Sequence, residues 1–133
     1  AAPILVAWAS LGTEPPMADL SIQVREVDGV AVLEPAGFIN AHTVRQFEES
    51  MERLVEAGKF SILLNCRELA YISSAGLGAI MGLIETVRGN GGDILLCDLQ
   101  EGVFAIFDTL GFPQLYKVFP DEAAALADLA GKA

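Results

Sequence analysis

Residues 69–99, LAYISSAGLGAIMGLIETVRGNGGDILLCDL, contain the pattern that decides the fold of this chain. After two adjacent serines, apolar residues recur at the spacing of one helix face, namely Leu77, Ile80, Met81, Ile84 and Val87. The glycine-rich residues 89–93 end this helix. A short continuous apolar run follows at 93–99, which is typical of a strand buried on both faces. A helix that leads into a buried strand indicates a parallel sheet with helical crossovers.

The segments on either side continue this alternation of strands and helices. Residues 20–37 carry near-alternating apolar side chains around Asp28-Gly29, a dipeptide that favours a two-residue hairpin turn. We therefore expect strands at about 21–27 and 30–36. The other expected elements are a helix at 40–59 capped by Asn40 or Thr43, a buried strand at 60–66, a helix around 103–110, a strand at 115–119 and a closing helix at 120–130.

This order, ββαβαβαβα, predicts a single α/β domain with a mixed, largely parallel sheet, an N-terminal hairpin and four helices. We expect the domain to span residues 17–133, with residues 1–16 as an added extension or linker ahead of a native start at Met17. The alternative is a genuine N-terminal arm that docks on the domain, or on a second copy to give a homodimer through residues 1–16. Its apolar side chains are Ile4, Leu5, Val6 and Trp8.

The composition excludes several classes of function. Hydrophobic residues make up 53% of the chain and charged residues 20%, as in a compact folded domain, and the net charge is −10. The basic residues form no cluster, so no nucleic-acid partner is expected. No segment has the ~18 apolar residues of a membrane span. The apolar stretch at 3–9 lacks the basic flank of a signal peptide, so we expect no membrane insertion and a cytoplasmic location.

The two cysteines and the single histidine bear on redox and metal chemistry. Cys66 and Cys97 each end a strand-like apolar run, and we interpret them as reduced thiols of the core. A single histidine, His42, cannot supply a His/Cys ligand set. No metal and no cofactor are therefore expected.

The adjacent serines, Ser73 and Ser74, allow a catalytic, a structural and a regulatory interpretation. The sequence I-S-S-A-G lacks the G-x-S-x-G of a hydrolase, and nothing in the sequence orients His42 as a base, so no enzyme is expected. Either serine can cap the helix by accepting a hydrogen bond from a free N–H of its first turn. Gly76 and Gly78 indicate a close approach to that helix end, by the protein's own sheet or by a partner.

Residues 69–99, together with IFDTLGFPQLYKVFPDEAAALADL at 106–129, resemble the STAS domain of bacterial anti-sigma factor antagonists. The shared features are an apolar strand, a helix start of the form (Asp/Ser)-Ser-(Ser/Thr/Ala)-Gly-Leu-Gly, a glycine-flanked buried strand and a similar C-terminal ending. The resemblance covers about residues 19–131. It implies the same element order that the periodicity predicts.

The resemblance also implies a partner-switching function. The unmodified domain would bind a serine kinase that doubles as an anti-sigma factor, and would so release the sigma factor. Phosphorylation of Ser74 by that kinase would end the binding, and a PP2C-type phosphatase would reset the domain. The small residues Ala75, Gly76 and Gly78 would leave room for the partner to approach an outward-facing helix end. The implied partner surface consists of Asn40, Ala41, His42, Thr43, Ser73, Ser74, Ala75, Gly76, Leu77 and Gly78.

Two positions depart from the family pattern. Asn40 and Ser73 stand where the family often has aspartate, which leaves Ser73 open as an alternative phosphate acceptor. A second hypothesis makes the domain a constitutive interaction subunit of a transporter or signalling complex. In that case the serines are helix caps only, and the helix start is a permanent docking surface.

Overall fold

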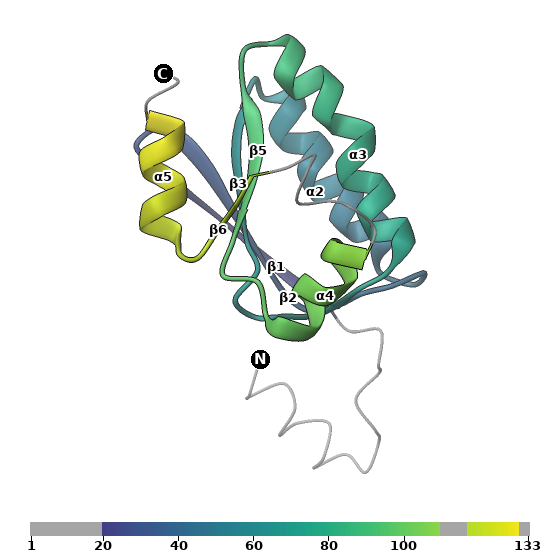
Figure 1. Cartoon of the computed structure of the whole chain (residues 1–133). Coiled ribbons are helices and arrows are strands. Elements are labelled where there is room, and N and C mark those ends of the chain that lie inside the picture. Colours follow the sequence, from purple (N-terminus) through teal and green to yellow (C-terminus); the bar gives the residue numbers. More distant parts are fainter. Residues whose placement is uncertain (1–19, 110–116, 131–133) are drawn as a thin grey trace, which may run out of the picture.

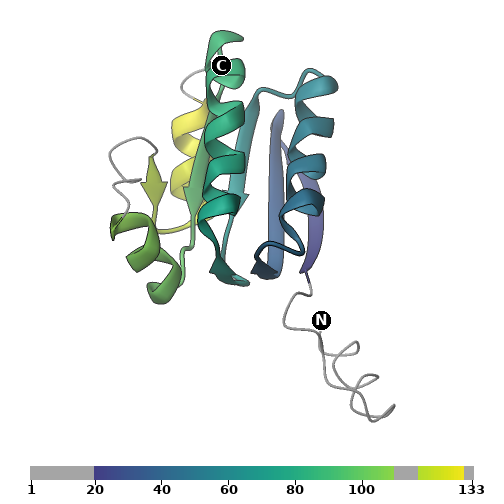
Figure 2. The same cartoon turned by 90° about the vertical axis from the view of Figure 1, so that its right-hand side faces the viewer.

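The computed structural model describes residues 20–109 and 117–130, in which a sheet lies between helices on both faces (Figures 1 and 2). Helices α2 and α3 cover one face, α4 lies at the end of the same side, and α5 covers part of the other face. In chain order the elements are β1 Leu20–Val27, β2 Val30–Ile39, α2 Val44–Glu56, β3 Ser61–Asn65, β4 Leu69–Ile72, α3 Ser74–Gly89, β5 Asp93–Cys97, α4 Glu101–Thr109, β6 Val118–Phe119 and α5 Glu122–Ala130.

The described strands form one six-stranded sheet in the order β1-β2-β3-β5-β6, with β4 also paired to β2. Only the β1–β2 pair is antiparallel in this part of the chain, and the other pairs are parallel. Asp28 and Gly29 join β1 to β2 with φ angles of 52° and 82°, the positive values that a two-residue hairpin turn requires. The predicted mixed sheet and N-terminal hairpin are therefore confirmed.

Strand β4 is the element that the sequence interpretation did not separate, so the described order is ββαββαβαβα. It has only four residues, of which Leu69 and Ile72 are buried, and its register with β2 shifts between Gly37 and Phe38. A shift of this kind breaks the period-two pattern by which a strand is recognised. The expected domain boundary at Met17 and the expected extension at 1–16 lie outside the described residues.

Within the described part of the chain the core consists of two apolar clusters, one on each face of the sheet. The larger lies under α2, α3 and α4 and includes Cys66, and the smaller lies under α5 and includes Cys97. Both cysteines are free and buried, as predicted, and burial raises the pKa of the Cys66 thiol to about 12. One residue of the helix face predicted from the sequence does not belong to the core, since Met81 is 47% exposed.

Helix α5 is fixed to its face of the sheet by a carboxylate as well as by apolar contacts. Glu122 accepts hydrogen bonds from Arg25 of β1 at 2.6 Å and from Asn65 of β3 at 2.9 Å. Arg25 also pairs with Glu34 of β2. The hydrogen bond from Arg25 lowers the pKa of Glu122, with a further contribution from Asn65. Residues on three neighbouring strands thus fix where α5 begins.

Candidate protein-binding site at the start of helix α3

The two serines have different roles in the structure. Ser73 is the N-cap of α3, and its Oγ accepts a hydrogen bond from the Gly76 N–H at 3.2 Å. Its own N–H donates to the Ile39 carbonyl at 2.8 Å, and its carbonyl accepts from the Leu77 N–H at 3.1 Å. Ser74 is the first helical residue and is exposed, and its hydroxyl makes no hydrogen bond with any described residue. The capping interpretation is therefore confirmed for Ser73.

The loop before α2 is fixed by its own side chains. The Asn40 Oδ1 accepts a hydrogen bond from the His42 N–H at 2.9 Å, and the Asn40 N–H donates to the Thr43 Oγ1 at 2.9 Å. Thr43 is buried, and its hydroxyl donates to the Phe38 carbonyl at 2.7 Å. Thr43 is the N-cap of α2 without a side-chain cap bond, so the predicted capping by its hydroxyl is wrong. Ala41 and His42 are left at the exposed tip.

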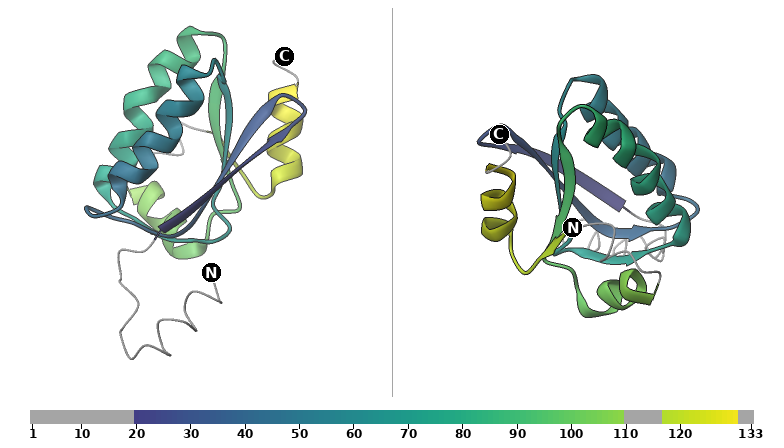
Figure 3. Two further views of the ribbon diagram at one scale, coloured as in Figure 1. Left: turned by 180° about the vertical axis from the view of Figure 1, so that it is seen from behind. Right: turned by 45° about the horizontal axis from the view of Figure 1, so that its top comes forward.

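This loop and the start of α3 lie side by side at one end of the sheet (Figure 3, left). The cause is the parallel pairing of β2 with β4, in which Ile39 is the register partner of Ile72. The chain leaves both strands at the next residue, so the two connections emerge together. The hydrogen bond from Ser73 to Ile39 joins them directly. The proximity that the resemblance implied is thus present in the structure.

The expected outward orientation of Gly76 is wrong. Gly76 is buried, and a Cβ at this position would lie 2.7 Å from both Ile39 Cγ2 and Ile72 Cγ1. The absence of a side chain lets α3 pack onto the ends of β2 and β4. Leu77 is only 2% exposed and belongs to the core. Gly78 is exposed with open space around it, as expected of a residue on a docking surface.

The expected partner surface therefore divides into an accessible part and a supporting part. Thr43, Gly76 and Leu77 are buried and shape the surface from beneath. The accessible residues carry no carboxylate and no permanent positive charge, and they lie at the helix end where the dipole favours an anion. They are Asn40, Ala41, His42, Ser73, Ser74, Ala75 and Gly78.

No group of three or more histidine, cysteine or acidic side chains among the described residues could hold a metal ion. No helix in the described part of the chain is long and apolar enough to cross a membrane. The surface at the start of α3 offers small side chains, an exposed hydroxyl and a fixed loop, which suits contact with another protein.

Comparison with known proteins agrees with this architecture. The family model described as STAS domain matches residues 21–125. The anti-sigma F factor antagonist of Paenibacillus polymyxa is 25% identical over 112 residues, which cover 84% of this chain and 96% of that protein.

Two solved structures share the fold. The crystal structure of an anti-sigma factor antagonist from Mycobacterium paratuberculosis has a TM-score of 0.80 at 17% identity, covering 87% of this chain and 97% of that one. The Bacillus cell fate determinant SpoIIAA in its phosphorylated form has a TM-score of 0.63 at 19% identity, covering 81% of this chain and 98% of that one.

Proposed function

The chain belongs to the STAS domain family, and from this premise we propose that it is a phosphorylation-controlled, non-catalytic binding domain that antagonises an anti-sigma factor. The observation that carries the proposal is the position of Ser74. Its exposed hydroxyl lies in the first turn of α3, beside the loop Asn40–Thr43, within the part of the chain that the family model matches. A cytoplasmic serine kinase that is also the anti-sigma factor is the proposed partner.

Ser74, rather than Ser73, is the proposed phosphate acceptor. The Ser73 hydroxyl already caps α3 through Gly76, and a phosphate there would displace a contact worth about 1 kcal/mol. Ser74 projects from the helix start without such a bond to a described residue. In the proposed step the kinase transfers the γ-phosphoryl group of ATP to the Ser74 Oγ. ADP leaves, and the hydroxyl proton passes to a base of the kinase.

The phosphate would act on the partner more than on the domain itself. It adds a charge of about −1.5 to −2 at pH 7, and the positive end of the α3 dipole would accommodate it without unfolding. A partner fitted to the uncharged residues around Ser74 would instead face a bulky dianion at the centre of the contact. Burying such a charge unpaired costs several kcal/mol, which is enough to dissociate a regulatory complex. A PP2C-type phosphatase would restore binding by hydrolysing the phosphate.

Binding measurements with the purified cognate anti-sigma kinase test this proposal. The parent chain and Ser74→Ala should bind alike without ATP, and only the parent complex should dissociate when ATP is added. Ser74→Asp should bind about tenfold more weakly or worse, a difference of about 1.4 kcal/mol. Ser73→Ala is the matched control, because it removes a neighbouring hydroxyl and should still respond to ATP. Equal binding by Ser74→Asp and the parent would contradict the proposal.

A constitutive docking subunit of a transporter or signalling complex is the second candidate. The observation that favours it is the capping bond from Gly76 to Ser73, which gives one serine of the pair a purely structural role. In this version the same surface binds its partner permanently, and neither ATP nor Ser74→Asp changes the affinity. The binding measurements with and without ATP therefore distinguish the two candidate functions.

A further inference from the structure

Two aromatic side chains, Phe38 and Tyr71, lie next to the proposed binding site but outside the core. They are register partners on β2 and β4, immediately before Ile39 and Ile72. Successive side chains of a strand point to opposite faces, and the two isoleucines belong to the cluster under α2 and α3. The aromatic pair therefore faces the α5 side of the sheet. Tyr71 is 41% exposed, and Phe38 is half-buried without belonging to either apolar cluster.

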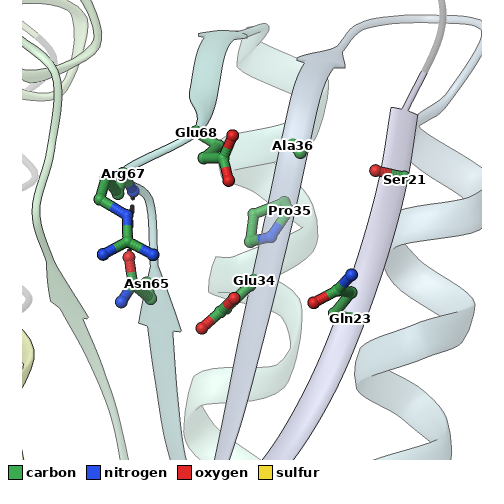
Figure 4. A pocket seen from close by; sticks show the side chains of 8 residues that line it. All are labelled: Ser21, Gln23, Glu34, Pro35, Ala36, Asn65, Arg67 and Glu68. Atoms are coloured by element: carbon green, nitrogen blue, oxygen red, sulfur yellow. Dashed lines mark hydrogen bonds between the residues drawn. The ribbon is translucent and has the colours of Figure 1, made fainter. Parts of the chain in front are cut away.

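Among residues 20–109 and 117–130, no helix lies over this part of the sheet. Helix α5 covers only the region over the smaller cluster, away from the end of the sheet where β1 begins (Figures 1 and 3). A hollow of about 90 Å³ lies on the uncovered part of the same face (Figure 4). Its lining is mostly polar and includes Gln23, Glu34, Asn65, Arg67 and Glu68. The aromatic pair at the ends of β2 and β4 is thus a small apolar patch beside this polar hollow.

The chain enters the sheet close to this patch. Strand β1 begins at Leu20, which is the register partner of Gly37, the residue before Phe38. Adjacent strands are about 4.8 Å apart, so two strand spacings, or about 10 Å, separate β1 from β4 here. Residues 1–19 lie outside the described structure. Within them, residues 3–9 have the apolar sequence PILVAWA. The ten residues from 10 to 19 can span up to about 33 Å, several times the distance needed.

We propose that residues 3–9, the N-terminal arm, dock on the Phe38–Tyr71 pair of their own domain. The arm supplies Ile4, Leu5, Val6 and Trp8, the kind of apolar side chain that an exposed aromatic pair buries. A short tether gives an effective concentration in the millimolar range, so even weak contacts hold the arm in place. An arm from the same chain therefore has the advantage over a second copy at ordinary protein concentrations.

Docking at this pair would place the arm beside the proposed partner surface. Phe38 and Tyr71 are each two residues from a member of that surface, Asn40 and Ser73. The docked arm would compete with the partner for access to the start of α3. This regulatory consequence rests on the proposed function, whereas the docking itself does not. The arm and the partner can accordingly be tested separately.

Trp8 is the only tryptophan of the chain, so its fluorescence reports on the arm alone. We would measure its emission and its quenching by acrylamide in the full chain, in Tyr71→Ser and in Phe38→Ser. Val24→Ser is the matched control, because Val24 is also an exposed strand residue, with 52% exposure, but lies on the other face of the sheet from the aromatic pair. Its register partner Leu33 belongs to the cluster under α2 and α3. Far-UV circular dichroism establishes that each variant is folded.

Docking predicts shielded, blue-shifted emission in the parent and in Val24→Ser. In the two aromatic variants the emission should shift to the red, and the quenching constant should rise about twofold or more. None of these values should depend on protein concentration. Solvent-like emission in the parent, or no change in either folded aromatic variant, would overturn the proposal. A shielding that disappears on dilution would also overturn it, since the occupant would then be a second copy. None of these outcomes involves the kinase, so they do not bear on the proposed function.

Discussion

Replacing Gly76 or Gly78 with alanine separates internal packing from surface shape at the start of α3. Both glycines lie in the same helix, two residues apart, and both gain up to about 1 kcal/mol of helix propensity from the substitution. At Gly78 the added methyl meets nothing within 4 Å. At Gly76 it would lie 2.7 Å from two carbon atoms, about 1 Å inside ordinary carbon contact distances of ~3.5–4.0 Å.

The neighbours of Gly76 cannot move easily. The clashing atoms are the Cγ2 of Ile39 and the Cγ1 of Ile72, side chains that are 0% and 1% exposed in the packed core. Overpacking of this kind costs about 1–3 kcal/mol, and two contacts at once indicate the upper part of that range. After the gain in helix propensity, Gly76→Ala should lose about 1–2 kcal/mol of unfolding free energy. Gly78→Ala should be neutral or gain up to about 1 kcal/mol.

Urea unfolding followed by circular dichroism measures both values, and the comparison with Gly78→Ala removes the shared propensity effect. The expected difference between the two variants is about 2 kcal/mol. By the same argument Gly76→Arg should unfold the domain rather than only block a partner. Equal stabilisation by the two alanines would refute the reasoning, because it would mean that α3 does not pack against Ile39 and Ile72.

Three further outcomes follow from individual contacts. Ser73→Ala should lower the unfolding free energy by about 1 kcal/mol in urea titrations, because the helix cap is lost. An unchanged urea midpoint would show that the Ser73 cap does not stabilise the fold. The pKa of Glu122 is lowered in the folded state by its bond from Arg25, so this bond stabilises the fold above the ordinary value of 4.5 and is lost as the pH falls below it. Acid titration of stability should be shallower in Glu122→Gln than in the parent, and an identical profile would show that the bond does not contribute. Cys66 and Cys97 should react slowly with iodoacetamide at pH 8 until urea unfolds the chain, because burial raises the pKa of both thiols; rapid alkylation of the native protein would contradict their burial.

The sequence was sufficient where a local pattern determines the structure. Asp28-Gly29 between two alternating apolar runs favours a turn with positive φ angles, so the hairpin could be predicted without knowledge of the rest of the fold. The strand at 93–97 was recognisable because residues 94–97 form a continuous apolar run, and all five of its residues are buried in the structure. A capping serine was expected at 73 or 74, but only the geometry of the Gly76 N–H decides between them.

The sequence was insufficient where the answer depends on what lies across the fold. Gly76 and Gly78 look equivalent in the chain, yet only Gly76 faces two isoleucines contributed by different strands. Strand β4 was hidden by the register shift that turns Tyr71 to the open side of the sheet. The pairing of Tyr71 with Phe38 joins residues more than thirty positions apart, and a local sequence pattern cannot predict such a contact.

The central claim is that a phosphate on Ser74 controls binding, and site mapping coupled to complex dissociation tests it most directly. The complex with the cognate anti-sigma kinase is incubated with ATP, separated by size, and the free chain is analysed by peptide mass spectrometry. The account predicts that the released chain carries a single phosphate on Ser74, while the chain that remains bound carries none. A chain that is released without phosphate, that carries it on Ser73, or that stays bound when Ser74 is phosphorylated would contradict the account.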